Sequence, residues 1–132
     1  MSSVGFDREM RDYLEEQARN AGAWQVDWPL SKQREAWEEA CRKARARRPA
    51  RLMVEDMDAA GLHLRIYRPP GEDPKPGILY AHGGGWTMGS CDTHDDLCAE
   101  LADEADVVVV CFDYRRAPEH PHPAQIEDAA KV

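Results

Sequence analysis

The chain lacks the features that define several large classes of protein. Its 132 residues contain four cysteines and no Cys-x-x-Cys pair, so the sequence predicts neither a zinc ribbon nor a disulfide-rich secreted domain. No apolar run approaches the roughly 18 residues of a membrane span, and the N-terminus carries no apolar signal segment. The net charge of −8 argues against nucleic acid or an anionic membrane surface as the main partner. These absences favour a reduced, cytoplasmic protein.

Six cations between residues 42 and 51 are a local exception to the acidic balance. Such a cluster can bind nucleic acid, but here it follows several glutamates on the same predicted helix. Acids near the start and bases near the end of a helix suit its dipole, and the pairs Glu38/Arg42 and Glu39/Lys43 have i,i+4 spacing. The pattern favours a solvated helix face, so we expect no nucleic-acid partner.

Apolar side chains recur at helical spacing in the N-terminal part of the chain. They predict amphipathic helices over residues 6–21 and from 31 to about 48. The connector between them is unusually aromatic, because it holds Trp24 and Trp28. These tryptophans either pin the two helices together or form the wall of an apolar pocket, and the sequence leaves both readings open.

From residue 52 onward the periodicity becomes strand-like. Alternation predicts a half-buried strand over 62–67 with a weaker partner over 52–57, and short apolar runs predict strands at 77–81 and 107–112. The last run has no polar interruption, which is typical of a strand covered on both faces in a parallel sheet.

A helix is expected between the last two strands. Thr93 and Asp96 resemble a capping box, and Leu97, Leu101 and Ala105 mark the face that we expect to be buried. Strand, helix and strand form a right-handed βαβ unit. The predicted fold class is therefore α/β, with a sheet of about four strands.

The most informative motif is His82-Gly83-Gly84-Gly85-Trp86, which directly follows the apolar run 78–81. Three successive glycines after a strand leave backbone N–H groups free to face a ligand, and an oxyanion is the natural one. No Gly-Lys-Ser/Thr follows, so a Walker-type phosphate site is not supported. The alternative interpretation is a tight turn without a ligand.

A nucleophile to accompany such an anion site is missing from these residues. The chain contains no Gly-x-Ser-x-Gly, and its serines are Ser2, Ser3, Ser31 and Ser90. The first two lie at the terminus, and Ser31 looks like a helix cap. Ser90 lacks the preceding strand and the second glycine of a nucleophile elbow. The sequence therefore predicts a piece of catalytic machinery.

Two further segments make a family visible: Gly89-Ser90 with Thr93-His94-Asp95, and then residues 113–124, which read Asp-Tyr-Arg-Arg-Ala-Pro-Glu-His-Pro-His-Pro-Ala. Together with the preceding glycine turn, they closely resemble the hormone-sensitive-lipase-like esterases, bacterial carboxylesterases of the α/β-hydrolase fold. The resemblance implies two cap helices over residues 1–50. It also implies the first half of an α/β-hydrolase core over residues 51–132.

The resemblance places an oxyanion hole in the glycine turn. It implies that Gly84 and Gly85 donate backbone N–H groups to a tetrahedral intermediate and that Gly83 allows the turn. His82 is expected to support the loop rather than to act as a base. The aromatic residues expected to face the substrate are Trp86, Trp24 and Trp28.

A second polar group follows the last strand. In keeping with the family, it is expected to form a buried network that fixes the loop, made of Asp113, Tyr114, Arg115 and Glu119. Arg116 departs from the family, which usually has leucine there. The histidines of this segment could be imagined as metal ligands, but its prolines make it stiff and hydrolases of this kind need no metal, so we expect neither metal nor cofactor. Candidates for cis peptide bonds are Ala117-Pro118 and His122-Pro123.

The implied function is that of part of a carboxylic ester hydrolase that acts on small acyl esters by serine acylation. A continuation of the chain or a second polypeptide would carry Gly-x-Ser-x-Gly, the aspartate and the histidine. It would also supply the strand that lies beside residues 77–81 in the family's topology. The alternative is a noncatalytic remnant that binds an apolar ligand or a partner protein.

Overall fold

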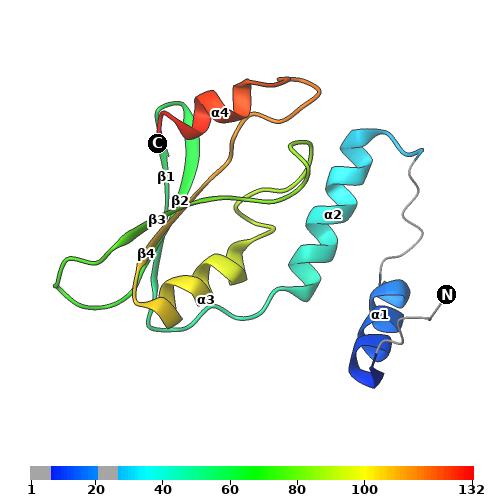
Figure 1. Cartoon of the computed structure of the whole chain (residues 1–132), viewed down its shortest axis with the longest axis horizontal. Coiled ribbons are helices and arrows are strands. Elements are labelled where there is room, and N and C mark those ends of the chain that lie inside the picture. Colours follow the sequence, from blue (N-terminus) through cyan, green and yellow to red (C-terminus); the bar gives the residue numbers. More distant parts are fainter. Residues whose placement is uncertain (1–6, 21–26) are drawn as a thin grey trace.

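The computed structural model describes residues 7–20 and 27–132. Its elements follow in the order α1 (Arg8–Asn20), α2 (Leu30–Ala44), β1 (Met53–Ala59), β2 (Leu62–Arg68), β3 (Gly77–Ala81), α3 (Asp95–Ala105), β4 (Val108–Phe112) and α4 (Ala124–Ala129). The described strands form one sheet with the order β1-β2-β4-β3. Helix α3 lies on one side of this sheet and α4 on the other (Figure 1). The predicted α/β class is confirmed.

The sheet is mixed rather than parallel throughout. Strands β1 and β2 form an antiparallel hairpin, whose turn residues Ala60 and Gly61 both have positive φ, as a two-residue hairpin turn requires. Strand β2 also pairs antiparallel with β4. Only β3 and β4 are parallel, with α3 as the crossover between them, so the predicted βαβ unit is confirmed.

The crossover helix turns a different face to the sheet from the one predicted. Its buried residues are Asp95, Cys98, Ala99 and Ala102, whereas Leu97 is 47% exposed and Ala105 is exposed. Small side chains let the helix approach the strands closely. The predicted capping box was also wrong, because α3 begins at Asp95 with His94 at its N-cap and no side-chain cap bond.

Strand β2 is buried on both faces, contrary to the expectation of a half-buried strand. On one face Leu62 and Leu64 pack with Phe112 and Tyr114. On the other, Tyr67 joins a core of β4 and α3 residues that includes three thiols, Cys91, Cys98 and Cys111. All four cysteines of the chain are free.

Asp95 is the electrostatic centre of this second face. Its carboxylate has no exposed surface, accepts two hydrogen bonds from Arg48 at 2.6 and 2.7 Å, and accepts further bonds from Arg65 at 3.1 Å and Tyr67 at 2.9 Å. Burial alone would raise the pKa of Asp95, but the bonds from Arg48 and Tyr67 lower it below its usual value. Arg65 and Tyr67 are themselves buried, and both donate to this carboxylate.

The same carboxylate explains why α2 ends earlier than predicted. The helix stops at Ala44, and Arg45 adopts an extended backbone. The extended segment lets Arg45 and Arg48 reach Asp95. Much of the basic cluster is therefore occupied within the chain.

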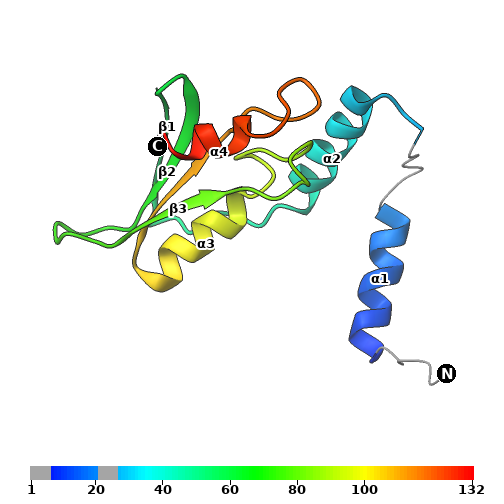
Figure 2. The same ribbon diagram turned by 45° about the horizontal axis from the view of Figure 1, so that its top comes forward.

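The N-terminal helices lie to one side of the sheet, with α1 beyond α2 in both views (Figures 1 and 2). The apolar side chains of α1, Met10, Tyr13 and Leu14, are exposed. Helix α2 has no fully buried residue. Within the described part of the chain, no helix is both long and apolar enough to cross a bilayer.

Strand β3 lies at the edge of the described sheet. On the face away from α3 the sheet carries an apolar hollow of about 410 Å³, lined by Leu64, Ile66, Gly77, Ile78, Leu79, Val110 and Val132. Leu79 of the edge strand is 47% exposed. An uncovered apolar edge of this kind is a template for pairing with another strand.

Substitution of Asp95 by asparagine should strongly destabilise the chain. Removal of one partner of a buried ion cluster leaves uncompensated charge, so we expect a loss of about 3–5 kcal/mol in urea unfolding. The matched control is Asp106→Asn, which removes an exposed carboxylate that binds Lys75 at 2.7 Å and should cost less than about 1 kcal/mol. Equal losses in the two variants would contradict the central role of Asp95.

Candidate functional site

The glycine turn leaves β3 at Ala81 and folds back on itself within a few residues. Gly84, Gly85 and Trp86 have φ values of 130°, 61° and 66°. The carbonyl of Gly84 accepts hydrogen bonds from the N–H groups of Thr87 and Met88 at 3.2 and 2.9 Å. Among the described residues, no acceptor faces the backbone N–H groups of Gly84 and Gly85.

Two glycines of this loop have no room for a side chain. A Cβ on Gly84 would lie 2.1 Å from the carbonyl oxygen of Met88, and a Cβ on Gly89 would lie 2.1 Å from the carbonyl oxygen of Gly83. Both residues also have positive φ. The loop is therefore a backbone structure that only glycine permits at these positions.

His82 is buried and holds the loop from inside. Its Nδ1 donates to the carbonyl of Gly83 at 3.0 Å, and its ring stacks on Tyr114 with centroids 4.2 Å apart. Burial lowers the pKa of His82 below its ordinary value, so the ring is neutral at pH 7. The Nε2 atom lies 3.8 Å from Asp113 and has no hydrogen bond within the described residues.

Two successive peptide groups are clamped by these contacts. The Tyr114 hydroxyl donates to the carbonyl of His82 at 2.8 Å, and His94 accepts the N–H of Gly83 at 3.2 Å. In the next peptide, the carbonyl of Gly83 is held by the His82 ring. Because a trans peptide is planar, its N–H points opposite to its carbonyl. The clamp therefore turns the Gly84 N–H away from the His82 ring.

The predicted network after β4 is present only in part and is not a single buried unit. Tyr114 is buried, and the Asp113 carboxylate accepts the N–H of Cys91 at 2.7 Å. Arg115 binds Asp128 of α4 instead. The side chain of Glu119 is 53% exposed. The four predicted residues thus hold different segments.

An arginine that the sequence did not single out joins α2 to both loops. Arg34 of α2 donates to the carbonyl of Thr87 at 2.7 Å and to the carbonyl of Ala117 at 2.8 Å. It also forms a bidentate pair with Glu119 at 2.7 and 2.8 Å, which lowers the pKa of Glu119 to about 2. Its partners lie 53 to 85 residues away in sequence, so no local pattern could reveal it.

Arg116 also supports the glycine loop. Its guanidinium donates to the carbonyl of Gly89 at 2.8 Å. The two candidate cis bonds of the same segment, Ala117-Pro118 and His122-Pro123, are both cis.

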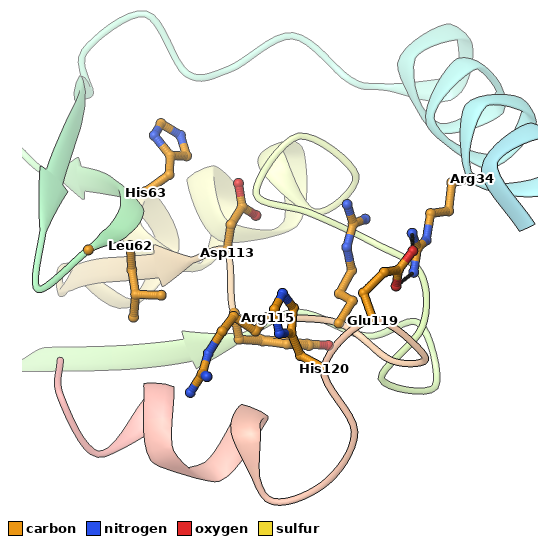
Figure 3. Close-up of a pocket in the computed structure, with 10 residues that line it drawn as sticks. Arg34, Leu62, His63, Asp113, Arg115, Glu119 and His120 are labelled. Atoms are coloured by element: carbon orange, nitrogen blue, oxygen red, sulfur yellow. Dashed lines mark hydrogen bonds and ion pairs between the residues drawn. The ribbon is translucent and has the colours of Figure 1, made fainter.

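The polar residues after β4 surround a hollow of about 370 Å³. Figure 3 shows Arg34 entering from α2, opposite His63 and Leu62 of β2, with Asp113 between them. All four predicted network residues line it, together with Gly61, Arg116 and His120. No residue of the glycine turn lines this hollow, so the two predicted groups of site residues border different cavities.

The glycine turn borders a smaller cavity of about 240 Å³, lined by Gly85, Trp86, Ala117, His122 and Gln125. Trp86 is 56% exposed there and lies beside Tyr114. Trp28 does not line this cavity. Its ring makes a cation–π contact with Lys32, whose Nζ lies 3.7 Å from the ring centroid. Trp24 lies outside the described residues. Of the two predicted tryptophans that the structure describes, Trp86 borders the cavity and Trp28 does not.

Within the described ranges, no group of three or more His, Cys, Asp or Glu side chains is arranged to hold a metal ion. The histidines weighed as ligands, His120 and His122, line different cavities.

Comparison with known proteins bears on the fold of the chain. Residues 78–132 match the family described as having the alpha/beta hydrolase fold. Over 71 residues the chain is 51% identical to the carboxylic ester hydrolase LipN of Mycobacterium tuberculosis, a match that covers 54% of this chain and 19% of LipN.

Two solved structures share the fold over almost the whole chain. A hyperthermophilic esterase from the archaeon Pyrobaculum calidifontis superposes with a TM-score of 0.78 and 33% identity, covering 95% of this chain and 41% of the esterase. An esterase from the bacterial hormone-sensitive lipase family superposes with a TM-score of 0.80 and 25% identity. The match covers 97% of this chain and 42% of that esterase. The chain thus spans about two fifths of these esterases and about a fifth of LipN.

The sheet order, the glycine loop and these matches define the class: the chain has the α/β-hydrolase fold. Within that class, the chain is similar to carboxylic ester hydrolases, among them an esterase of the bacterial hormone-sensitive lipase family.

Replacement of Arg34 by lysine should loosen the loops on which it acts, because an ammonium group cannot reproduce the fork of a guanidinium. We expect the N–H groups of Met88 and Ala117 to exchange with solvent about tenfold faster. Arg51→Lys, which alters the pair with Asp103, is the matched control and should leave both amides unchanged. Unchanged exchange in the Arg34 variant would contradict the tether.

The free energy of unfolding should fall as the pH is lowered through 6.5. Burial lowers the pKa values of both His82 and His94 below 6.5, so the unfolded chain binds protons that the folded chain resists. Carboxylates with lowered pKa values, such as Asp95, lose their contribution only near pH 4 and below. Denaturant unfolding between pH 8 and 5 checks this, and a flat profile would contradict it. In His82→Phe the fall should be shallower.

Proposed function

We propose that this chain supplies the oxyanion-binding part of a serine carboxylesterase. The observation that carries the proposal is the clamped loop beside a cavity, in which the neighbouring N–H groups of Gly84 and Gly85 have no acceptor among the described residues. Fixed donors aimed at a developing oxyanion stabilise the tetrahedral intermediates of ester hydrolysis. The loop is expected to hold them in place before substrate arrives.

The nucleophile, its base and the orienting aspartate lie, on this proposal, on a continuation of the chain or on a second polypeptide. Ser90 is an unsuitable nucleophile, because its hydroxyl donates to Glu38 at 2.8 Å and accepts the N–H groups of Asp92 and Thr93. The open edge of β3 supports an additional strand there. A strand at that edge would end beside the glycine loop.

Small acyl esters are the proposed substrates. The cavity beside Gly85 has a volume of about 240 Å³, which suits a short acyl or alcohol group. Trp86 would form its apolar wall, and Trp28 and Trp24 of the cap are proposed to approach it in the complete site. Four free thiols suit a reducing, cytoplasmic setting.

A second candidate function rests on the apolar hollow of about 410 Å³ on the open sheet face. A noncatalytic remnant could bind an apolar ligand or a partner protein there. Co-expression with a polypeptide that carries the next strand, Gly-x-Ser-x-Gly, the aspartate and the histidine separates the two functions. Hydrolysis of p-nitrophenyl acetate by the complex supports the esterase, whereas an assembled but inactive complex supports the binding protein.

In that complex, Gly84→Ala should lower kcat by about 10²–10³-fold, the effect of losing an oxyanion donor. The new Cβ collides with the carbonyl of Met88, so the loop must open. Gly71→Ala is the matched control, because Gly71 has a similar φ of 118° and a Cβ there meets only the end of the Lys75 side chain. It should retain turnover. Wild-type turnover in the Gly84 variant would reject the assigned role.

A further inference from the structure

His94 sits at the junction between the glycine loop and α3. It is the N-cap residue of the helix, and its ring lies between two fixed partners. Its Nε2 is 3.2 Å from the backbone nitrogen of Gly83, and its Nδ1 is 2.9 Å from the hydroxyl of Thr93. A Cβ built on Gly83 would lie 3.2 Å from the same Nε2, so the ring packs directly against the loop backbone.

The positions of the protons follow from the one donor whose role is fixed. The Gly83 backbone nitrogen can only donate, so Nε2 of His94 must be an unprotonated acceptor. In a neutral ring the proton is then on Nδ1, which donates to Thr93. The Thr93 hydroxyl also accepts the N–H of Ser90 at 2.9 Å and donates its own proton to the Ser90 carbonyl at 2.9 Å. Each hydrogen bond in the series Gly83–His94–Thr93–Ser90 then has one donor and one acceptor.

Protonation of the ring would break this arrangement at a single point. An imidazolium carries a proton on each nitrogen, so Nε2–H would face the N–H of Gly83, donor against donor. The peptide between His82 and Gly83 would lose the hydrogen bond from its N–H to His94. Tyr114 would still hold its carbonyl end.

We infer that His94 is a positioning residue for the oxyanion loop, which holds the Gly83 peptide through its unprotonated Nε2 and releases it when the ring is protonated. This inference rests on the proposed function of the loop and adds a pH-dependent control of the same site. The residue touches no reacting atom. Its effect on Gly84 passes through the peptide that it orients.

The surroundings of the ring set the balance between its two states. Burial lowers the pKa of His94 below its ordinary value, while hydrogen bonding of the ring to the Ser90 backbone carbonyl and the carboxylates of Asp96 and Glu38 act in the opposite direction. The ring of His82 lies 6.0 Å away, and that of Tyr80 lies 5.9 Å away. The neutral, loop-holding form is therefore the form present at pH 7.

The first test uses the 132-residue chain labelled with ¹⁵N and requires no turnover, so its outcome is independent of whether the proposed esterase activity is found. Long-range ¹H–¹⁵N correlation should show His94 protonated on Nδ1 at pH 8. Between pH 8 and 5, the amide resonance of Gly83 should move with the same midpoint as the His94 ring. A ring protonated on Nε2, or a Gly83 amide that does not follow it, would overturn the inference.

Variants then separate positioning from packing. His94→Gln offers an amide oxygen that accepts without titrating, so Gly83 should stay protected from hydrogen exchange and lose its pH midpoint. His94→Leu should exchange about tenfold faster at Gly83. His120→Gln, which alters an exposed histidine outside the loop, is the control and should leave the Gly83 titration unchanged. Equal exchange in the Gln and Leu variants would mean that His94 only fills space.

Discussion

The planarity of two successive peptide groups is the constraint on which the site depends. The carbonyl of His82, the N–H of Gly83 and the carbonyl of Gly83 are each held by a different ring. A planar peptide with its carbonyl fixed has its N–H fixed as well. The direction of the Gly84 N–H is thus set by residues that never contact the atom it would bind.

The rest of the fold brings those rings together. Parallel pairing places Ala81 opposite Phe112, so His82 and Tyr114 leave the sheet at the same edge and stack. The buried carboxylate of Asp95 anchors the start of α3 to β2 through Arg65 and Tyr67, which places His94 beside the loop. From outside, Arg34 joins α2 to the carbonyl of Thr87. Each support comes from a separate element.

The sequence predicted those parts that depend on local pattern. The strand 77–81, the βαβ unit and the glycine turn all follow from short apolar runs and glycine spacing. The sequence-based predictions were wrong where a polar partner distant in sequence determines which face of a helix is buried or where a helix ends. Leu97 is exposed because α3 turns Asp95 inward, and α2 ends at Ala44 because the arginines beyond it extend to that carboxylate. The bonds of Arg34 span more than 50 residues, and a single sequence carries no signal of such pairs.

The central claim is that the Gly84 and Gly85 N–H groups of this chain bind an oxyanion. The most direct measurement is a crystal structure of the assembled esterase with a phosphonate bound covalently to its nucleophilic serine. The account predicts a phosphonyl oxygen about 2.7–3.1 Å from both backbone nitrogens, with the Tyr114, His82 and His94 contacts intact. A phosphonyl oxygen bound by other donors, with both amides turned away, would contradict it.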